Sequence, residues 1–185
     1  IEFDFDDKDS KVKIVSTIEA RMTSTRLPGK VLLPVNNKPM LYYLVKRLKQ
    51  VKSIHEIVLA TTINKTDDTL VEFAKGMNIS FYRGSEEDVL ERVIGAAESV
   101  GGNLIVEITG DCPIIDPFIV EQTIQMFLHN DVDYVSNAHV RSYPDGMDTQ
   151  VFRLETLKKS AQMTDNAADR EHVTLHIRRH PEIFL

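Results

Sequence analysis

The chain has 185 residues, of which 42% are hydrophobic and 27% charged, and this is the composition of one ordinary globular domain with a proper core. Its formal net charge of −6 argues against nonspecific nucleic-acid binding, and its short, interrupted apolar runs argue against membrane insertion. Cys112 is the only cysteine, which excludes an internal disulfide and fits a cytoplasmic location. Residues 1–10 lack the pattern of a signal peptide, and we expect them to be an N-terminal extension, natural or added, before a domain at 11–185.

Strands and helices alternate through the first half of the chain. Buried strands are predicted where valine and isoleucine dominate short runs, and helices are predicted where apolar residues recur every three or four positions. Pro39 suits the first turn of a helix, because proline has no amide hydrogen to donate. The predicted elements are strands at 11–19, 56–61 and 79–82 and helices at 39–51 and 67–77.

The alternation continues in the second half. Ser85 can cap a helix that has Asp88 three residues on, and the glycine pair at 101–102 ends that helix. The other predicted elements are strands at 103–109 and 133–137 and a helix at 116–129. This order predicts an α/β fold with a mainly parallel central sheet and helices on both faces.

A basic loop follows the first predicted strand. Residues 19–30 read E-A-R-M-T-S-T-R-L-P-G-K and hold Arg21, Arg26 and Lys30, while Asp111 follows the strand at 103–109. Ligands bind outside the carboxyl ends of the strands in open α/β sheets, so both loops face one crevice if both strands are central. Cations opposite a carboxylate fit a polyphosphate with Mg²⁺ on Asp111. The alternatives are a solvated basic patch and, for Asp111, a helix cap or turn.

Two familiar phosphate-binding motifs are absent from the sequence. The Walker pattern fails because Ser24 stands at its first glycine and Val31 follows Lys30. The pattern G-x-G-x-x-G does not occur near the first strand. These failures exclude a P-loop ATPase and a usual NAD-binding domain.

Five segments, in order, carry a family resemblance. They are ARMTSTRLPGKVL at 20–32, RGSEEDVLERV at 83–93, ITGDCPIIDP at 108–117, YPDGMDTQVF at 143–152 and REHVTLHIRR at 170–179. Together they resemble the cytidylyltransferases that activate acidic sugars, such as the ketodeoxyoctulosonate and acylneuraminate enzymes. The resemblance is greatest to the branch called spore coat polysaccharide biosynthesis protein F.

The resemblance implies a nucleotidyltransferase with a glycosyltransferase-A type of fold. Such an enzyme binds CTP with Mg²⁺, transfers CMP to a small sugar acceptor and releases pyrophosphate, here in surface polysaccharide or glycoconjugate synthesis. The implied triphosphate contacts are Arg21, Arg26 and Lys30, and the implied Mg²⁺ ligand is Asp111. The backbone near Ala20, with Arg83 and Ser85, would surround the base and ribose. The competing hypotheses are a glycosyltransferase that consumes nucleotide sugars and a non-catalytic nucleotide-binding module.

The acceptor site and the end of the domain are less well marked. Asp145 and Asp148 are predicted to bind acceptor groups, but a plain turn at residues 144–146 explains them as well. Glu19 stands where this branch more often has glutamine. Relatives continue beyond the position of Leu185 and supply a second metal carboxylate there, so we expect the domain to lack a C-terminal segment. They commonly dimerise through later segments, which allows for a homodimer.

Several other polar residues have a simpler interpretation. His172 and His176 are spaced as zinc ligands on a helix, but no H-E-x-x-H motif is present and a structural role is favoured. Asp131 and Asp133 match the D-x-D pattern of glycosyltransferases, yet they precede their strand and should lie at the wrong edge of the sheet. Cys112 has no histidine nearby in the sequence and reads as a small buried residue. Residues 170–171 are candidates for an acceptor or dimer surface.

Overall fold

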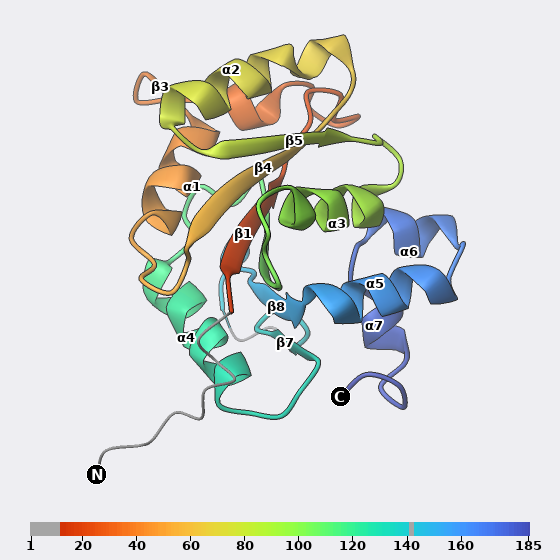
Figure 1. Ribbon diagram of the computed structural model, residues 1–185. Helices are drawn as coiled ribbons and strands as arrows, with labels where there is room; N and C mark the ends of the chain where they lie inside the picture. The colour runs from red at the N-terminus through yellow and green to blue at the C-terminus, as the bar shows by residue number, and fades with distance from the viewer. Residues whose placement is uncertain (1–11, 141–142) are drawn as a thin grey trace.

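A six-stranded sheet, in the order β5-β4-β1-β6-β8-β7, runs through the centre of the molecule (Figure 1). The computed structural model describes residues 12–140 and 143–185, so the expected extension at 1–10 lies outside the described residues. The strands of this sheet are β1 (Ile14–Glu19), β4 (Glu56–Thr62), β5 (Ser80–Gly84), β6 (Leu104–Thr109), β7 (Tyr134–Ser136) and β8 (Gln150–Arg153). Two short strands, β2 (Pro34–Val35) and β3 (Lys38–Pro39), form a separate antiparallel pair.

The sheet is mainly parallel, as predicted. β1 pairs in parallel with β4 on one side and β6 on the other, and β4 pairs in parallel with β5. Only β8 runs the other way, between β6 and β7, and it was not predicted from the sequence. Because β1 and β6 are neighbours that point the same way, the loops after Glu19 and Thr109 leave the same edge of the sheet.

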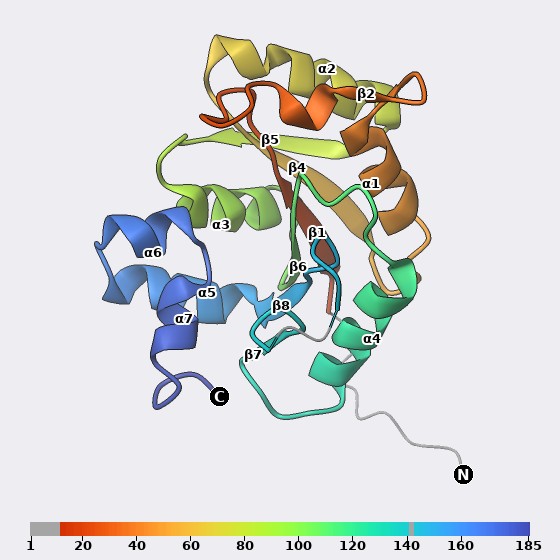
Figure 2. The ribbon, with the colours of Figure 1, turned by 180° about the vertical axis from the view of Figure 1, so that it is seen from behind.

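Helices cover both faces of the sheet, which confirms the predicted fold class (Figures 1 and 2). One face carries α1 (Met40–Leu48), α2 (Asp68–Met77) and α4 (Pro117–Leu128). The other face carries α3 (Val89–Ser99), α5 (Leu154–Met163), α6 (Ala167–Glu171) and α7 (Leu175–Arg179). No helix among the described residues has the length and apolar character needed to cross a bilayer.

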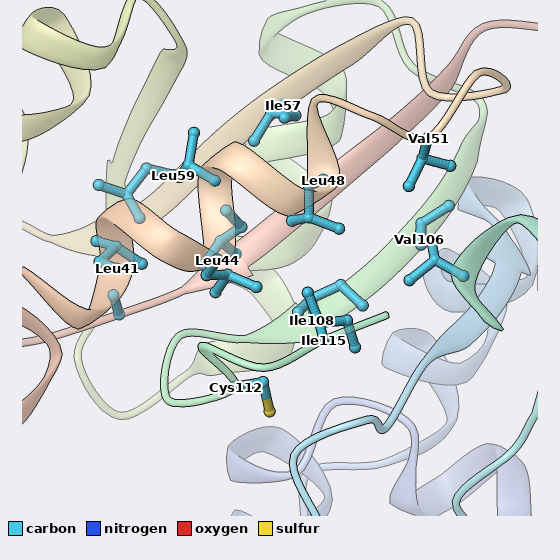
Figure 3. Close-up of a cluster of buried hydrophobic side chains, with 14 of the residues drawn as sticks. Leu41, Leu44, Leu48, Val51, Ile57, Leu59, Val106, Ile108, Cys112 and Ile115 are labelled. Carbon is cyan, nitrogen blue, oxygen red and sulfur yellow. The ribbon is translucent and has the colours of Figure 1, made fainter. Parts of the chain in front are cut away.

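The hydrophobic core on the α1 side holds the central strands in place. Leu41, Leu44 and Leu48 project from α1 onto the sheet, and all three are fully buried (Figure 3). They pack with Leu59 of β4 and Ile108 of β6, which are 0% and 1% exposed. Burying each such side chain contributes roughly 1.5–3 kcal/mol. The carboxyl ends of the central strands are therefore a rigid platform for the loops above them.

One predicted helix start is wrong by a few residues. The helix predicted from Ser85 begins at Val89, and its cap is Asp88, whose carboxylate accepts the amide hydrogen of Glu91 at 2.9 Å. Ser85 instead accepts the amides of Glu87 and Asp88 at 3.2 and 3.1 Å, so it closes the turn that precedes the helix. Ser85 and Asp88 are both residues that can cap a helix, and the helix starts after Asp88, the later of the two.

Candidate active site

The two loops predicted to face each other do meet. Lys30, from the loop after β1, places its Nζ atom 2.5 Å from Oδ2 of Asp111, in the loop after β6. Both side chains remain partly open, at 28% and 42% exposure. A cation and a carboxylate 81 residues apart in the chain thus share one edge of the sheet.

The shape of the basic loop follows from a few backbone contacts. Gly29 has a φ of +70°, a left-handed conformation that favours glycine, and its amide donates to the carbonyl of Met22 at 2.9 Å. That hydrogen bond closes the loop, and a short 3₁₀ helix, Lys30–Leu32, follows with Val31 buried beneath it. Arg21 and Lys30 are consequently carried at the two ends of one closed loop.

A cleft of about 610 Å³ lies between the two loops. Six residues of the predicted site line it: Ala20, Arg21, Arg26, Lys30, Asp111 and Asp148. The lining formed by the described residues does not include Arg83, Ser85 or Asp145. The structure therefore brings together the predicted phosphate and metal residues and one of the two predicted acceptor residues.

Arg83 has protein partners at each of its three nitrogens. Its Nε and one terminal nitrogen donate to the backbone carbonyls of Thr62 and Asn64, at 2.8 and 2.7 Å. The other terminal nitrogen lies 2.7 Å from the carboxylate of Asp68. Here Arg83 ties the end of β5 to the segment before α2, and its assignment to the nucleotide stays a prediction.

Glu86 contacts the site residue Arg21 from outside the described cleft lining, and sequence reasoning missed it. Its carboxylate accepts from the hydroxyl of Thr23, from Asn64 at 2.5 Å and from the guanidinium of Arg21 at 3.2 Å. The hydrogen bonds from Thr23 and Asn64, with the charge of Arg21, hold the pKa of Glu86 below its usual value. Glu86 thereby fixes the direction of Arg21, and the acidic run at 86–88 was the only sequence signal for it.

Asp111 is ionised and accessible. Burial opposes its charge, but the hydrogen bond and the charge of Lys30 hold the pKa of the carboxyl below its ordinary value. The adjacent Cys112 is buried, and that burial raises the pKa of its thiol to about 11. A thiol with so high a pKa is a poor nucleophile at neutral pH, which agrees with the interpretation of Cys112 as a small buried residue.

The donor set at Asp111 fits Mg²⁺ better than a metal held by protein alone. Among residues 12–140 and 143–185, no group of three or more His, Cys, Asp or Glu side chains is placed to hold a metal ion. Mg²⁺ usually takes one or two carboxylates and completes its six oxygens with water and substrate phosphates. One open aspartate beside a row of cations is compatible with that arrangement.

The floor of the cleft contains a carboxyl pair that the sequence did not reveal. Glu19 ends β1 and donates a hydrogen bond to Glu107 of β6, and burial raises the pKa of both groups. Gln150 of β8, the register partner of Glu107, donates to the other side of the Glu107 carboxylate. The carbonyl oxygen of Gln150 accepts from Tyr134 and Thr174 at 2.5 and 2.6 Å. A hydrogen-bonded row thus crosses four elements beneath the cleft.

Replacing Glu19 by glutamine is expected to stabilise the protein at pH 8 and to have little effect near pH 4.5. Because the pKa of Glu19 is raised in the folded state, the folded protein binds more protons than the unfolded chain above pH 4.5, and stability falls as the pH rises. Glutamine keeps a donor for Glu107 without that dependence. We expect a gain of about 1 kcal/mol at pH 8, the scale of one buried hydrogen bond, in urea unfolding at both pH values. An equal gain at both pH values would contradict this account.

The remaining sequence candidates lie in different parts of the molecule. Asp133 hydrogen-bonds to Thr156 and to the backbone of Leu185, at the amino end of β7, and it does not line the cleft. His176 is buried, with its Nδ1 atom 3.5 Å from Asp169, whereas His172 lines the cleft. Among the described residues neither histidine belongs to a group of three or more side chains that could hold a metal ion, and their roles stay predictions.

Of the candidate surface at 170–171, only the second residue reaches the cleft. Arg170 donates to the carbonyls of Thr164 and Ala161, at 3.1 and 2.7 Å, and its guanidinium lies 3.3 Å from Asp88. Arg170 therefore joins α5 and α6 to the start of α3. Glu171 lines the cleft on the side of Thr174 and Arg178.

Comparisons with known proteins identify the family to which this chain belongs. A family model described as cytidylyltransferase matches residues 15–185. The chain belongs to the cytidylyltransferase family. This cytidylyltransferase is 35% identical over 178 residues to the spore coat polysaccharide biosynthesis protein SpsF of Bacillus subtilis, and the match covers 92% of this chain and 72% of that relative.

Two further likenesses agree with this family. It is 33% identical over 117 residues, 63% of this chain and 48% of the relative, to the 8-amino-3,8-dideoxy-manno-octulosonate cytidylyltransferase of Shewanella piezotolerans. A solved cytidylyltransferase structure from Leptospira borgpetersenii has a TM-score of 0.87 at 35% identity, covering 94% of this chain and 73% of that one. The predicted family and the nucleotidyltransferase type of fold are both confirmed, and the protein is a nucleotidyltransferase.

Proposed function

We propose that this cytidylyltransferase transfers CMP from CTP to an acidic sugar, with release of pyrophosphate and with Mg²⁺, in the cytoplasmic synthesis of a surface polysaccharide. One observation carries the proposal. Lys30 and Asp111 meet 2.5 Å apart at the mouth of a cleft that Arg21 and Arg26 also line. Three cations and an open aspartate at one sheet edge match what a triphosphate with its metal requires.

The roles of the cations follow from where charge develops. When an acceptor oxygen attacks the α-phosphorus, negative charge grows on the phosphoryl oxygens and on the departing pyrophosphate. Positioned cations stabilise that charge, and in such transfers they supply most of the catalysis. Lys30 and Arg21 would hold the triphosphate from the two ends of the closed loop, and Arg26 would contact it from the exposed middle of that loop.

Asp111 would hold the metal. Bound Mg²⁺ would neutralise phosphate charge and help to orient the triphosphate for attack. In the protein without nucleotide, Asp111 is neutralised by Lys30, so binding of the metal and of CTP requires the ammonium and the carboxylate to exchange partners. This pair is partly exposed and of modest strength, and separating it costs about 0–1 kcal/mol.

The acceptor would occupy the part of the cleft away from the basic loop. Asp148, Gln150 and Thr174 line that part, and they come from the β8 side of the sheet. The relative from Shewanella piezotolerans is named for an octulosonate, an acidic sugar, and this name supports an acceptor of the same class. Asp145 would act through the turn that carries Asp148.

Thermal unfolding with a panel of nucleoside triphosphates tests the nucleotide half of the proposal. With Mg²⁺ present, CTP at a hundred times its dissociation constant should add about 2.7 kcal/mol to the free energy of unfolding, and UTP, ATP and GTP at that concentration should add less. Chelation of Mg²⁺ should weaken the effect of CTP. Pyrophosphate release with an octulosonate then tests the transfer.

Three results would contradict the proposal. Equal stabilisation by all four triphosphates would show that the protein does not prefer cytosine. Full stabilisation by CTP in EDTA would show that CTP binding does not need a metal ion. Binding of CTP with no pyrophosphate release from any acidic sugar would leave a nucleotide-binding module and not a transferase.

A further inference from the structure

The floor of the cleft holds two carboxyl groups for which the chemistry of the triphosphate has no use. Side chains alternate along a strand, so Glu19 of β1 and Glu107 of β6 lie on the face covered by α3, with Val15 and Ile105 of the second core cluster. Glu107 is 5% exposed, and within residues 12–140 and 143–185 no cation is in hydrogen-bond contact with its pair with Glu19. Burying two carboxyl groups is costly unless they are partnered by charge.

The charge of the lining changes away from the basic loop. Outside the three loop cations and Asp111, the ionisable acids and arginines among the described lining residues are Glu19, Glu107, Asp148, Glu171, Arg92 and Arg178. The acids outnumber the arginines, so this part of the cleft is negative when all of the groups are charged. It therefore attracts a cationic group, whereas the basic loop attracts the triphosphate.

Arg92 of α3 is a buried cation that lines the cleft beside this pair. Its side chain is 3% exposed, and one terminal nitrogen donates to the carbonyls of Ser85 and Glu86, at 2.5 and 3.3 Å. Its Nε has no hydrogen-bond partner, and of the described residues with such a buried atom, Arg92 is the only one that lines the cleft. An ionised Glu19 would complement this guanidinium, but burial and the neighbouring Glu107 raise the pKa of Glu19 well above its ordinary value.

We propose that Glu19, Glu107 and Arg92 form an acceptor subsite that binds a protonated primary amine, so that the acceptor is an acidic sugar bearing an amino group. This inference rests on the proposed function. The arriving ammonium brings one positive charge, and the proton that Glu19 shares with Glu107 leaves to solvent. Two carboxylates then face one ammonium, and the charge of Glu19 is also neutralised by Arg92. Arg178, the remaining arginine of the lining, lies in α7 and not in the basic loop. Its guanidinium would bind the carboxylate of the acceptor.

Other charged and polar neighbours of the pair do not supply this charge. Glu19 faces Thr17, whose hydroxyl lies 3.5 Å away, and feels the charge of Arg92. Glu107 faces Gln150 and feels the charges of Arg178 and Asp148, which oppose each other. A neutral hydroxyl would be bound equally well by one carboxylate and an amide, which would avoid the second buried acid.

Two acceptors that differ by one group provide the test. The probes are 8-amino-3,8-dideoxy-manno-octulosonate and 3-deoxy-manno-octulosonate, which carry an amine and a hydroxyl at the same carbon. We expect kcat/KM for the amino probe to exceed that for the hydroxyl probe at least tenfold. Glu107→Gln should bring the ratio to within about twofold of unity, mainly through a higher KM for the amino probe. Glu72→Gln, in the exposed α2 pair with Lys75, is the matched control and should leave the ratio unchanged.

Calorimetry measures proton release on binding, a quantity that would not change if Glu19 and Glu107 had only a structural role. Binding of the amino probe to the enzyme with a non-hydrolysable CTP analogue should release up to one proton, seen as a dependence of the binding heat on the buffer. Glu19→Gln should abolish that release. Equal turnover of both probes, an unchanged ratio in Glu107→Gln, or no turnover of the amino probe while CTP still binds would overturn the subsite and leave CTP binding standing. Absence of CTP binding would instead refute the proposed function itself.

Discussion

Replacing Lys30 by alanine is expected to lower kcat for CMP transfer by roughly a hundred- to a thousandfold, the loss of about 2.7–4 kcal/mol that follows removal of one well-placed donor. Lys30 stands at the closed end of the basic loop, fixed by the hydrogen bond from Gly29 to Met22 and by the buried Val31 next to it. Its ammonium is the only cation shown in contact with Asp111, within the described residues. Pyrophosphate release under saturating CTP measures the effect.

The variant should fold normally. The Lys30 side chain is 28% exposed and its partner Asp111 is 42% exposed, so an unpaired Asp111 carboxylate can be hydrated. A surface pair of this kind contributes about 0–1 kcal/mol to stability. Lys75→Ala, which breaks the exposed pair with Glu72, is the matched control and should keep full activity. Turnover of Lys30→Ala within tenfold of wild type would exclude a catalytic role for the lysine.

The arrangement of the two site loops could be predicted because it depends on topology alone. Apolar runs at 11–19 and 103–109 predicted two strands, and if both are central and parallel their loops leave the same edge of the sheet. The structure places both strands in the centre of the sheet. The proximity of Lys30 and Asp111 could therefore be predicted without knowing how the residues of the two strands are paired. The antiparallel strand β8 could not be found in the same way, because its four residues come directly after a turn and show too short a pattern.

The carboxyl pair could not be predicted, because it depends on which residues lie opposite each other. Glu107 interrupts the apolar run L-I-V-E-I-T, where a single acid reads as the solvent-facing position of a strand. Only the register that sets Thr17 beside Glu107, with Glu19 two residues on, brings the two acids together. The contact between Glu86 and Arg21 could not be predicted either, since nothing in the sequence around Glu86 indicates which cation it would bind. The loop residues that line one side of the cleft were predicted from the sequence, whereas the carboxyl pair at its floor was found only in the structure.

Asp67→Asn is expected to lower the free energy of unfolding by roughly 2–4 kcal/mol, which is the scale of several charge-assisted hydrogen bonds made by one buried group. Asp67 is 0% exposed. One carboxylate oxygen accepts the amide of Met22 at 2.9 Å, and the other accepts from Thr61 and from the amide and hydroxyl of Thr62, at 2.9, 3.1 and 2.6 Å. An amide group in this place must turn its own hydrogens toward at least one of these donors.

The acid side of the stability curve reports the same contacts. Burial opposes the charge of Asp67, but the hydrogen bonds from Thr62, Met22 and Thr61 hold its pKa below the ordinary value. The stabilisation is thus present at pH 7 and is lost only as the pH falls below about 4, through the folded-state pKa. The difference between wild type and Asp67→Asn should therefore narrow in acid.

Asp68→Asn is the matched control for Asp67→Asn, because it makes the same change at an exposed carboxylate one position later. The Asp68 side chain is 54% exposed, and its pair with Arg83 is a surface contact worth about 0–1 kcal/mol. In a chain of this size each kcal/mol moves the melting temperature by roughly 2–4 °C, so the two variants should differ clearly in a thermal scan. Because Asp67 holds the amide of Met22, Asp67→Asn should also raise the KM for CTP by loosening the basic loop. Equal melting temperatures for the two variants would show that Asp67 does not anchor that loop.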